Sequence, residues 1–192
     1  MTAIILAGGK SSRMGRDKAF IDIGGIPLIK RQIVELKKIF NKIIIVTNTP
    51  EKYKFRGLKV IRDILPGLGP LGGIYSGLMG SGAFYNFVVA CDIPILSIRL
   101  IKYMLSQRYG FDAVVPKLSK GYETLFAVYS KNCLRSIYQA LKSNNLRVRQ
   151  IFEEISLKEI TEQQIAKFGN PKILFMNINT KAALDKAKEL LK

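Results

Sequence analysis

The segment from Leu6 to Lys18 carries the residue types that best fit the chemistry of phosphate groups. It leaves an apolar run at Leu6, passes through Gly8 and Gly9, and then becomes basic. Glycines let backbone N–H groups approach phosphate oxygens without a Cβ in the way. Arg13 and Lys18 would neutralise a triphosphate as negative charge moves toward a leaving pyrophosphate. We therefore expect a nucleoside triphosphate to bind on this loop.

Two better-known glycine motifs do not match this segment. Gly9–Ser11 imitates the end of a P-loop, but that motif needs its first glycine at position 4, where the chain has Ile4. The dinucleotide fingerprint needs Gly-x-Gly-x-x-Gly, which the adjacent pair Gly8 and Gly9 does not supply. A plain glycine turn between a strand and a helix is the remaining alternative. The residues that favour phosphate binding over that turn are Arg13, Gly15, Asp17 and Lys18.

Asp92 follows a second apolar run, and Pro94 ends the strand direction two residues later. Its carboxylate is therefore expected to point into a cleft at the end of the strand. Magnesium prefers carboxylate oxygen and keeps several waters, so Asp92 is a candidate ligand for an ion that bridges triphosphate oxygens. An aspartate that caps the next helix is the alternative.

Asp63 also ends a predicted strand, and the glycine-rich stretch Gly67–Ile74 follows it. We interpret this stretch as a turn that leads into a helix, whose N-terminal amides could meet anionic or base groups. A tight turn without a ligand is the alternative.

Asn177 and Asn179 occupy alternate positions of the predicted last strand, so both are expected to face one side of it. Thr180 then caps the final helix. Helix capping and loop tethering are the alternative roles for these asparagines.

The elements that must position these residues are short β-branched runs alternating with amphipathic stretches. The predicted strands are Ala3–Leu6, Ile43–Thr47, Leu58–Ile61, Phe87–Ala90, Ala113–Pro116 and Leu174–Asn177. The predicted helices are Pro27–Phe40, Ile98–Leu105, Leu134–Leu141 and Thr180–Leu191. We predict surface loops at Lys142–Arg149 and Glu162–Pro171.

This alternation predicts right-handed crossovers and a mostly parallel sheet with helices on both faces. Ligands of such sheets bind at the carboxyl ends of the strands. Tyr122–Ser130 follows the preceding strand too closely for a crossover helix, so we expect an antiparallel partner and a mixed sheet. The length of 192 residues fits one α/β domain spanning residues 1–192.

The amino-acid composition limits the kinds of reaction that the chain could catalyse and the partners that it could bind. The chain has no histidine, the commonest general base and transition-metal ligand, which favours phosphoryl over acyl chemistry. Cys91 and Cys133 are predicted to be reduced packing residues. The net charge of +17 suits an anionic partner, but the lysines are scattered, so a solvated basic surface is an equal interpretation. A nucleic-acid-binding module is therefore the rival from another class, and we do not favour it.

No segment approaches the run of about 18 apolar residues that a membrane helix needs. The start of the chain also lacks a basic region and a cleavage site of the secretory kind. We expect a cytoplasmic protein that makes no membrane contact.

The motif Leu-Ala-Gly-Gly-x-Ser-x-Arg-Met-Gly-x-Asp-Lys at Leu6–Lys18 resembles the signature of molybdenum cofactor guanylyltransferases. Three later segments resemble further signatures of that family in the same order: Gly69–Ile74, Asp92–Pro94 and Asn177–Thr180. The resemblance covers the chain from Leu6 to Thr180. Thr124 departs from it, because the family usually has proline there.

The resemblance implies a Rossmann-like nucleotidyltransferase fold and a set of site residues. It implies nucleotide-binding roles for Leu6, Ala7, Gly8, Gly9, Lys18, Asp63 and Asp92. Catalytic roles would belong to Arg13, Lys18 and Asp92, with Asp92 as the ligand of Mg²⁺. Asn177 and Asn179 would lie near the acceptor.

The activity that the resemblance implies is transfer of GMP from GTP to molybdopterin or its molybdenum form, with release of pyrophosphate. The product is the guanine dinucleotide form of the cofactor, and other biosynthesis proteins of this cofactor would be partners. Related cytidylyltransferases resemble Leu-Ala-Ala-Gly at the start of the motif, so Gly8 favours GTP. A nucleotidyltransferase that uses CTP, or a different phosphorylated acceptor, is the alternative.

Overall fold

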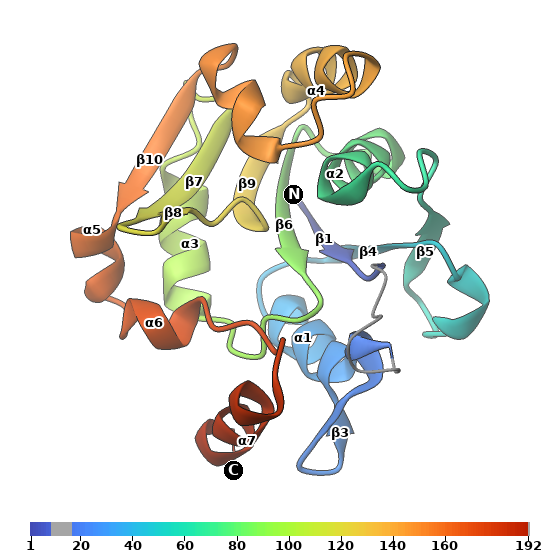
Figure 1. Cartoon of the computed structure of the whole chain (residues 1–192), viewed down its shortest axis with the longest axis vertical. Coiled ribbons are helices and arrows are strands. Elements are labelled where there is room, and N and C mark those ends of the chain that lie inside the picture. The colour runs from blue at the N-terminus through green and yellow to red at the C-terminus, as the bar shows by residue number, and fades with distance from the viewer. Residues whose placement is uncertain (9–16, 192) are drawn as a thin grey trace.

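The computed structural model describes residues 1–8 and 17–191 of the chain (Figure 1). Its strands are β1 (Thr2–Leu6), β2 (Asp22–Ile23), β3 (Ile26–Pro27), β4 (Lys42–Thr47), β5 (Lys59–Arg62), β6 (Tyr85–Ala90), β7 (Ala113–Leu118), β8 (Gly121–Tyr122), β9 (Phe126–Ser130) and β10 (Leu157–Thr161). The α-helices are α1 (Leu28–Lys37), α2 (Gly69–Gly80), α3 (Ile98–Ser106), α4 (Cys133–Lys142), α5 (Glu162–Ala166), α6 (Pro171–Leu174) and α7 (Lys181–Leu190).

Within the described residues, one eight-stranded sheet has the order β10-β7-β9-β6-β1-β4-β5, with β8 paired to β7. The strands β6, β1, β4 and β5 run parallel to one another. β9 runs antiparallel between β6 and β7, and β10 is parallel to β7. The predicted mixed, mostly parallel sheet is confirmed, and the antiparallel strand expected within Tyr122–Ser130 is β9.

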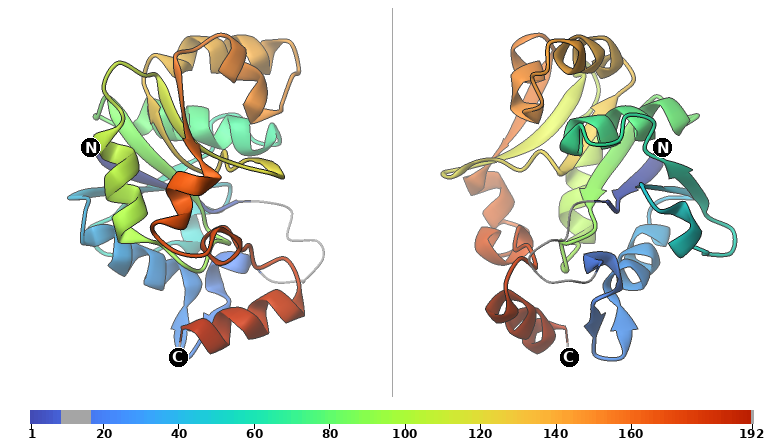
Figure 2. Two further views of the ribbon diagram at one scale, coloured as in Figure 1. Left: turned by 90° about the vertical axis from the view of Figure 1, so that its left-hand side faces the viewer. Right: turned by 45° about the vertical axis from the view of Figure 1, so that its right-hand side comes forward.

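Side chains of β1 alternate between two hydrophobic cores, as the period of a strand requires. Ala3 and Ile5 belong to the core that α1 and α3 cover, whereas Ile4 and Leu6 belong to the core under α2 and α4. Helices therefore cover both faces of the sheet, as predicted (Figure 2).

Glycines allow α2 to lie directly on β1. A Cβ at Gly77 would come within 2.6 Å of Cγ2 of Ile4, and a Cβ at Gly73 would come within 3.4 Å of Cδ2 of Leu6. A larger residue at Gly77 would therefore force the helix away from the strand. This contact holds α2, and the turn before it, beside the carboxyl end of β1.

The parallel register brings several strand ends to one edge of the sheet. Leu6, the last residue of β1, is level with Val46 of β4 on one side and with Ala90 of β6 on the other. The residues that follow β1, β4 and β6 therefore leave the sheet side by side. Asp63 follows β5 at the same edge, and its backbone N–H donates to the oxygen of Thr47 at 3.0 Å.

The C-terminal helix α7 lies below the sheet in the view of Figure 1, near the β2–β3 hairpin. A small third core joins the β2–β3 hairpin and the start of α1 to α7 through Ile23, Leu28, Ile178 and Ala187. Because the hairpin follows Lys18 in the chain and Ile178 precedes α7, this core brings the two segments together. It places Lys18 close to Asn179.

Two element predictions in the C-terminal part were wrong. Leu174–Asn177 is not a strand, because Asn170 caps the short helix α6 with its side chain and Pro171 occupies its first turn. Within the predicted loop Glu162–Pro171, α5 forms behind a capping box of Thr161 and Gln164. β10, which sequence analysis missed, takes the place at the sheet edge beside β7.

Among the described residues, no helix combines the length and the apolar character needed to cross a bilayer. The longest, α2, has 12 residues.

Candidate active site

Three side chains from distant parts of the chain meet at the carboxyl edge of the parallel strands. Lys18 Nζ donates to Asp92 Oδ2 at 3.3 Å and also to Oδ1 of Asn179. The side chains of Lys18 and Asp92 are 24% and 22% exposed, so a ligand in solvent can reach both. The ammonium group thus lies between a carboxylate oxygen and an amide oxygen that face a common point.

The backbone around Asp92 is anchored on two sides. Its carbonyl oxygen accepts from the N–H of the buried Ile178 at 2.9 Å, and the N–H of Cys91 donates to the oxygen of Leu6 at 3.0 Å. The first bond ties the segment before α7 to the end of β6, and the second ties the end of β6 to β1. Asp92 is therefore held between the central strand and the C-terminal segment.

Asn177 and Asn179, which were predicted to lie near the acceptor substrate, do not share one face of a strand. The N–H of Asn179 donates to the backbone oxygen of Asn177 at 3.0 Å, a bond across one residue that extended backbone does not make. This tight bend turns the chain into α7, which Thr180 caps by accepting from the N–H of Ala183. The structure brings the side chain of Asn179 to Lys18, and among the described residues no hydrogen bond joins the Asn177 side chain to Lys18 or Asp92.

Lys18 begins a 3₁₀ turn, Lys18–Phe20, whose position depends on Asp17. One carboxylate oxygen of Asp17 accepts from the N–H of Ala19 at 3.1 Å, and the other accepts from the hydroxyl of Tyr53 at 2.8 Å. Tyr53 is 1% exposed, and burial together with Asp17 raises the pKa of Tyr53 far above its usual range. The phenol therefore stays protonated and donates to Asp17.

The Tyr53–Asp17 bond leads to a stability prediction. Tyr53→Phe removes a buried donor and should lower the free energy of unfolding by about 1 to 2 kcal/mol, the usual loss for a hydrogen bond of this kind. Urea unfolding of the wild type and the variant measures this loss. Tyr138→Phe is the control, because Tyr138 is 45% exposed, and it should shift the free energy by less than about 0.5 kcal/mol. Equal stability of both variants would show that the bond contributes nothing.

Asp63 is 8% exposed and fastens the turn after β5 to α2. Its Oδ1 accepts from the Ser76 hydroxyl at 2.6 Å and from the N–H of Leu65 at 3.1 Å. The Ser76 hydroxyl in turn accepts from the N–H of Ile64 at 3.0 Å. Asp63 is therefore at the predicted edge, with one of its carboxylate oxygens already bound within the protein.

The described part of the glycine loop starts as predicted. Leu6 ends β1, and the buried Ala7 donates its N–H to the oxygen of Val46 at 2.8 Å. Gly8 is exposed and lies beside Asn48: a Cβ at Gly8 would be 3.5 Å from the backbone nitrogen of Asn48, an ordinary van der Waals distance. Gly9 and Arg13, two further predicted site residues, lie outside the described residues.

Comparison with known proteins decides the family. A sequence model described as the MobA-like NTP transferase domain matches residues 3–160. The chain belongs to this family. The resemblance seen in the sequence motifs is thereby confirmed, and the chain is a nucleotidyltransferase.

Full-length relatives agree with this MobA-like assignment. The chain is 36% identical over 187 residues to a "Probable molybdenum cofactor guanylyltransferase" of Pelotomaculum thermopropionicum, covering 97% of this chain and 91% of the relative. It is 38% identical over 197 residues to the protein of the same name in Natranaerobius thermophilus, covering 100% and 96%. The crystal structure of "Molybdopterin-guanine dinucleotide biosynthesis protein A" from Archaeoglobus fulgidus superposes with a TM-score of 0.86 at 25% identity, covering 100% and 98%.

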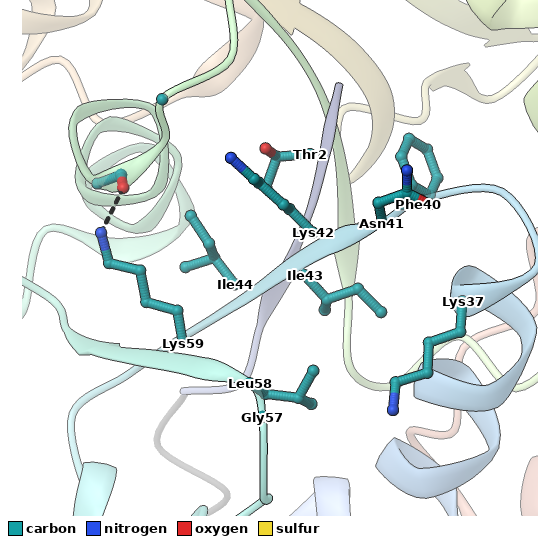
Figure 3. Close-up of a pocket in the computed structure, with 12 residues that line it drawn as sticks. Thr2, Lys37, Phe40, Asn41, Lys42, Ile43, Ile44, Gly57, Leu58 and Lys59 are labelled. Atoms are coloured by element: carbon teal, nitrogen blue, oxygen red, sulfur yellow. Dashed lines mark hydrogen bonds between the residues drawn. The ribbon is translucent and has the colours of Figure 1, made fainter.

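A cavity of about 380 Å³ lies at the other end of the sheet from these site residues (Figure 3). Thr2, Lys42 and Lys59, which line it, are the first residues of β1, β4 and β5. Lys59 donates to the oxygen of Gly80 at 2.7 Å, the bond drawn in Figure 3. Ligands of parallel sheets bind at the carboxyl ends of the strands, so this cavity is not the nucleotide site of a MobA-like transferase.

Both cysteines are free, as predicted, and neither supplies a reactive thiolate. Burial raises the pKa of Cys133 to about 12, and it raises the pKa of Cys91 further, with the Asp92 charge as the second cause. A thiol must ionise to act as a nucleophile or metal ligand. Neither cysteine is therefore a candidate nucleophile or metal ligand in this MobA-like protein.

Proposed function

We propose that this enzyme transfers GMP from GTP to molybdopterin or its molybdenum form, with release of pyrophosphate. The names of its full-length relatives support this activity. In this chain the proposal depends on one observation. Lys18, Asp92 and Asn179 come together at the carboxyl edge of the parallel strands. A cation between two side-chain oxygens at such an edge suits a polyanionic substrate.

The reaction exchanges one phosphorus–oxygen bond for another. An oxygen of the terminal phosphate of molybdopterin forms a bond to the α-phosphorus of GTP. The bond from that phosphorus to the oxygen bridging to the β-phosphate breaks, and pyrophosphate leaves with the electron pair. The protein needs to align two polyanions and stabilise the charge that moves onto the leaving group.

In this proposal Lys18 and Arg13 face the triphosphate. The amides of Gly8 and Gly9 approach its oxygens, and Leu6 and Ala7 border the base. A guanine beside Gly8 would also lie beside Asn48, since Gly8 passes within contact distance of it. Asp63 would contact the nucleoside from the neighbouring turn, with its Oδ2 facing the ligand because Oδ1 is bound within the protein.

The residues at the Lys18 contact also fit Mg²⁺. Oδ2 of Asp92 and Oδ1 of Asn179 are hard oxygen donors that already surround a positive charge. Among the described residues there is no group of three or more His, Cys, Asp or Glu side chains that could hold a metal ion. Mg²⁺ at Asp92 would therefore take most of its ligands from water and phosphate oxygens, as it usually does in nucleotide sites. Bound there, the ion neutralises phosphate charge.

Asn177 and Asn179 precede α7 and are proposed to face the acceptor side. Asn179 is the nearer of the two to the reacting centre, because it touches Lys18.

Calorimetric binding of GTP, CTP, ATP and UTP in the presence of Mg²⁺, followed by pyrophosphate release on addition of molybdopterin, tests this function. Selective binding of GTP with release that depends on the pterin is the expected result. A preference for CTP would overturn the choice of base, and release without molybdopterin would overturn the choice of acceptor.

A further inference from the structure

Gln32 is a polar residue on the buried face of α1. Its side chain is 1% exposed, and the residues that share this buried face are the apolar Leu28, Ile29, Ile33 and Leu36. A buried amide is unfavourable unless it is hydrogen-bonded, and an apolar residue of similar size would fill the space without that penalty. The presence of glutamine here points to a specific use of its polar atoms.

Those polar atoms contact the turn that carries Asp92. Nε2 of Gln32 donates to the carbonyl oxygen of Ala90 at 2.9 Å and to that of Ile93 at 2.7 Å. The two carbonyls lie on either side of Cys91 and Asp92 in the chain. An amide group has two N–H donors in a fixed planar arrangement, so one side chain sets the positions of both carbonyls.

The other polar atom of the Gln32 amide, its oxygen, makes no such contact. Oε1 of Gln32 is buried without a hydrogen-bond partner among the described residues. Unpaired buried acceptors are rare in native proteins, and each one needs a specific explanation. In Gln32 both hydrogen bonds of the amide come from its nitrogen, and both go to the turn that carries Asp92.

We infer that Gln32 is a positioning residue for Asp92. By spanning the turn from Ala90 to Ile93, it holds the Asp92 carboxylate toward Lys18 and Asn179. The backbone bonds of Cys91 to Leu6 and of Asp92 to Ile178 hold the same turn from other sides. This inference rests on the proposed function, because that function makes Asp92 a ligand of the metal–nucleotide complex.

Gln32→Met is the test variant, because methionine keeps the length of the side chain and removes both donors. The matched control is Asn86→Leu. Asn86 is 0% exposed, and its Nδ2 likewise donates to two backbone carbonyls, those of Ala83 at 3.1 Å and Phe84 at 3.3 Å. Asn86 lies near the amino end of β6, at the other end of the strand from Asp92.

The readout is the affinity of the protein–GTP complex for Mn²⁺, followed by the electron paramagnetic resonance signal of the free ion, beside GTP affinity without metal. Gln32→Met should weaken Mn²⁺ binding by about 10-fold, the low end of the loss seen when a group that orients a metal ligand is removed, because Gln32 acts on Asp92 through the backbone of the turn. GTP affinity without metal should change less than about threefold, because Gln32 does not face the nucleotide. Asn86→Leu should leave Mn²⁺ binding within about twofold of the wild type.

Wild-type Mn²⁺ affinity in folded Gln32→Met would overturn the inference, and so would an equal loss in Asn86→Leu, because that loss would reflect general instability. If Gln32→Met fails to fold, Gln32→Asn takes its place. Asparagine keeps an amide but is one methylene too short to reach both carbonyls, so its Mn²⁺ affinity should also fall. Failure of the wild type to bind Mn²⁺ with GTP would instead mark the failure of the proposed function.

Discussion

Replacing Asp92 by asparagine should lower the rate of pyrophosphate release at saturating GTP and Mg²⁺ by about 100- to 1,000-fold. Asparagine keeps the size of the side chain and one oxygen, but it removes the negative charge that attracts the metal ion. It also leaves the Lys18 ammonium without its charged partner, which lies 3.3 Å away in the free protein. Both changes alter the electrostatics of the site and not its shape.

The fold should survive this change. The Lys18–Asp92 pair is open to solvent on one side, with side chains 24% and 22% exposed, so solvent screens it and its contribution to stability is on the order of 1 kcal/mol. Glu51→Gln provides the control, because it removes one carboxylate charge from a side chain that is 61% exposed and belongs to the turn after β4. We expect its rate to match the wild type. A wild-type rate in Asp92→Asn would remove Asp92 from the catalytic machinery.

The position of Asp92 could be predicted from the sequence because it depends only on the pattern of buried strands. Continuous β-branched runs identify the buried parallel strands, and parallel strands place their carboxyl ends at one edge. Gly8, Asp63 and Asp92 each come just after such a run, so their location at one edge follows from the parallel direction of the strands. The same reasoning explains why the central strands β1, β4, β5 and β6 were predicted within two residues at each end.

The residues that hold the site in place could not be predicted from strand patterns. Tyr53, Ser76 and Gln32 act through hydrogen bonds to Asp17, Asp63 and the Asp92 turn, which are 13 to 61 positions away in the chain. Two of them left a signal in the sequence. Gln32 interrupts the apolar face of a predicted helix, and Ser76 is a hydroxyl residue four positions after Gly72 in an otherwise apolar helix.

The secondary-structure prediction for the C-terminal part was wrong for a different reason. Ile173, Leu174, Phe175 and Met176 form an apolar run that resembles a strand, but Asn170 and Pro171 begin a helix just before it. The edge strand β10 carries Lys158 and Glu159 and so lacks a clear apolar pattern. Its identity as a strand depends on pairing with β7, more than 40 residues earlier in the chain, and local sequence does not encode that pairing.

Replacing Lys18 by alanine should also lower the rate of pyrophosphate release by about 100- to 1,000-fold. The reason is the loss of an ammonium group that lies at the carboxyl edge of the strands, within reach of the triphosphate in the proposed complex. Lys37→Ala is the matched control for the loss of one of the 31 basic residues. Lys37 is exposed at the end of α1 and lines the cavity at the opposite end of the sheet, so its rate should equal that of the wild type.

The double variant Lys18→Ala with Asp92→Asn separates two explanations for the loss. If Lys18 stabilises the departing pyrophosphate directly, it acts on a group that Asp92 does not touch, and the double variant should be slower than either single variant. If Lys18 only holds Asp92 in place, removing it after Asp92 has been changed should cost nothing further, since residues in contact are coupled. We expect the first outcome. The Lys18 side chain also contacts Asn179, so its position in the free protein does not depend on Asp92 alone.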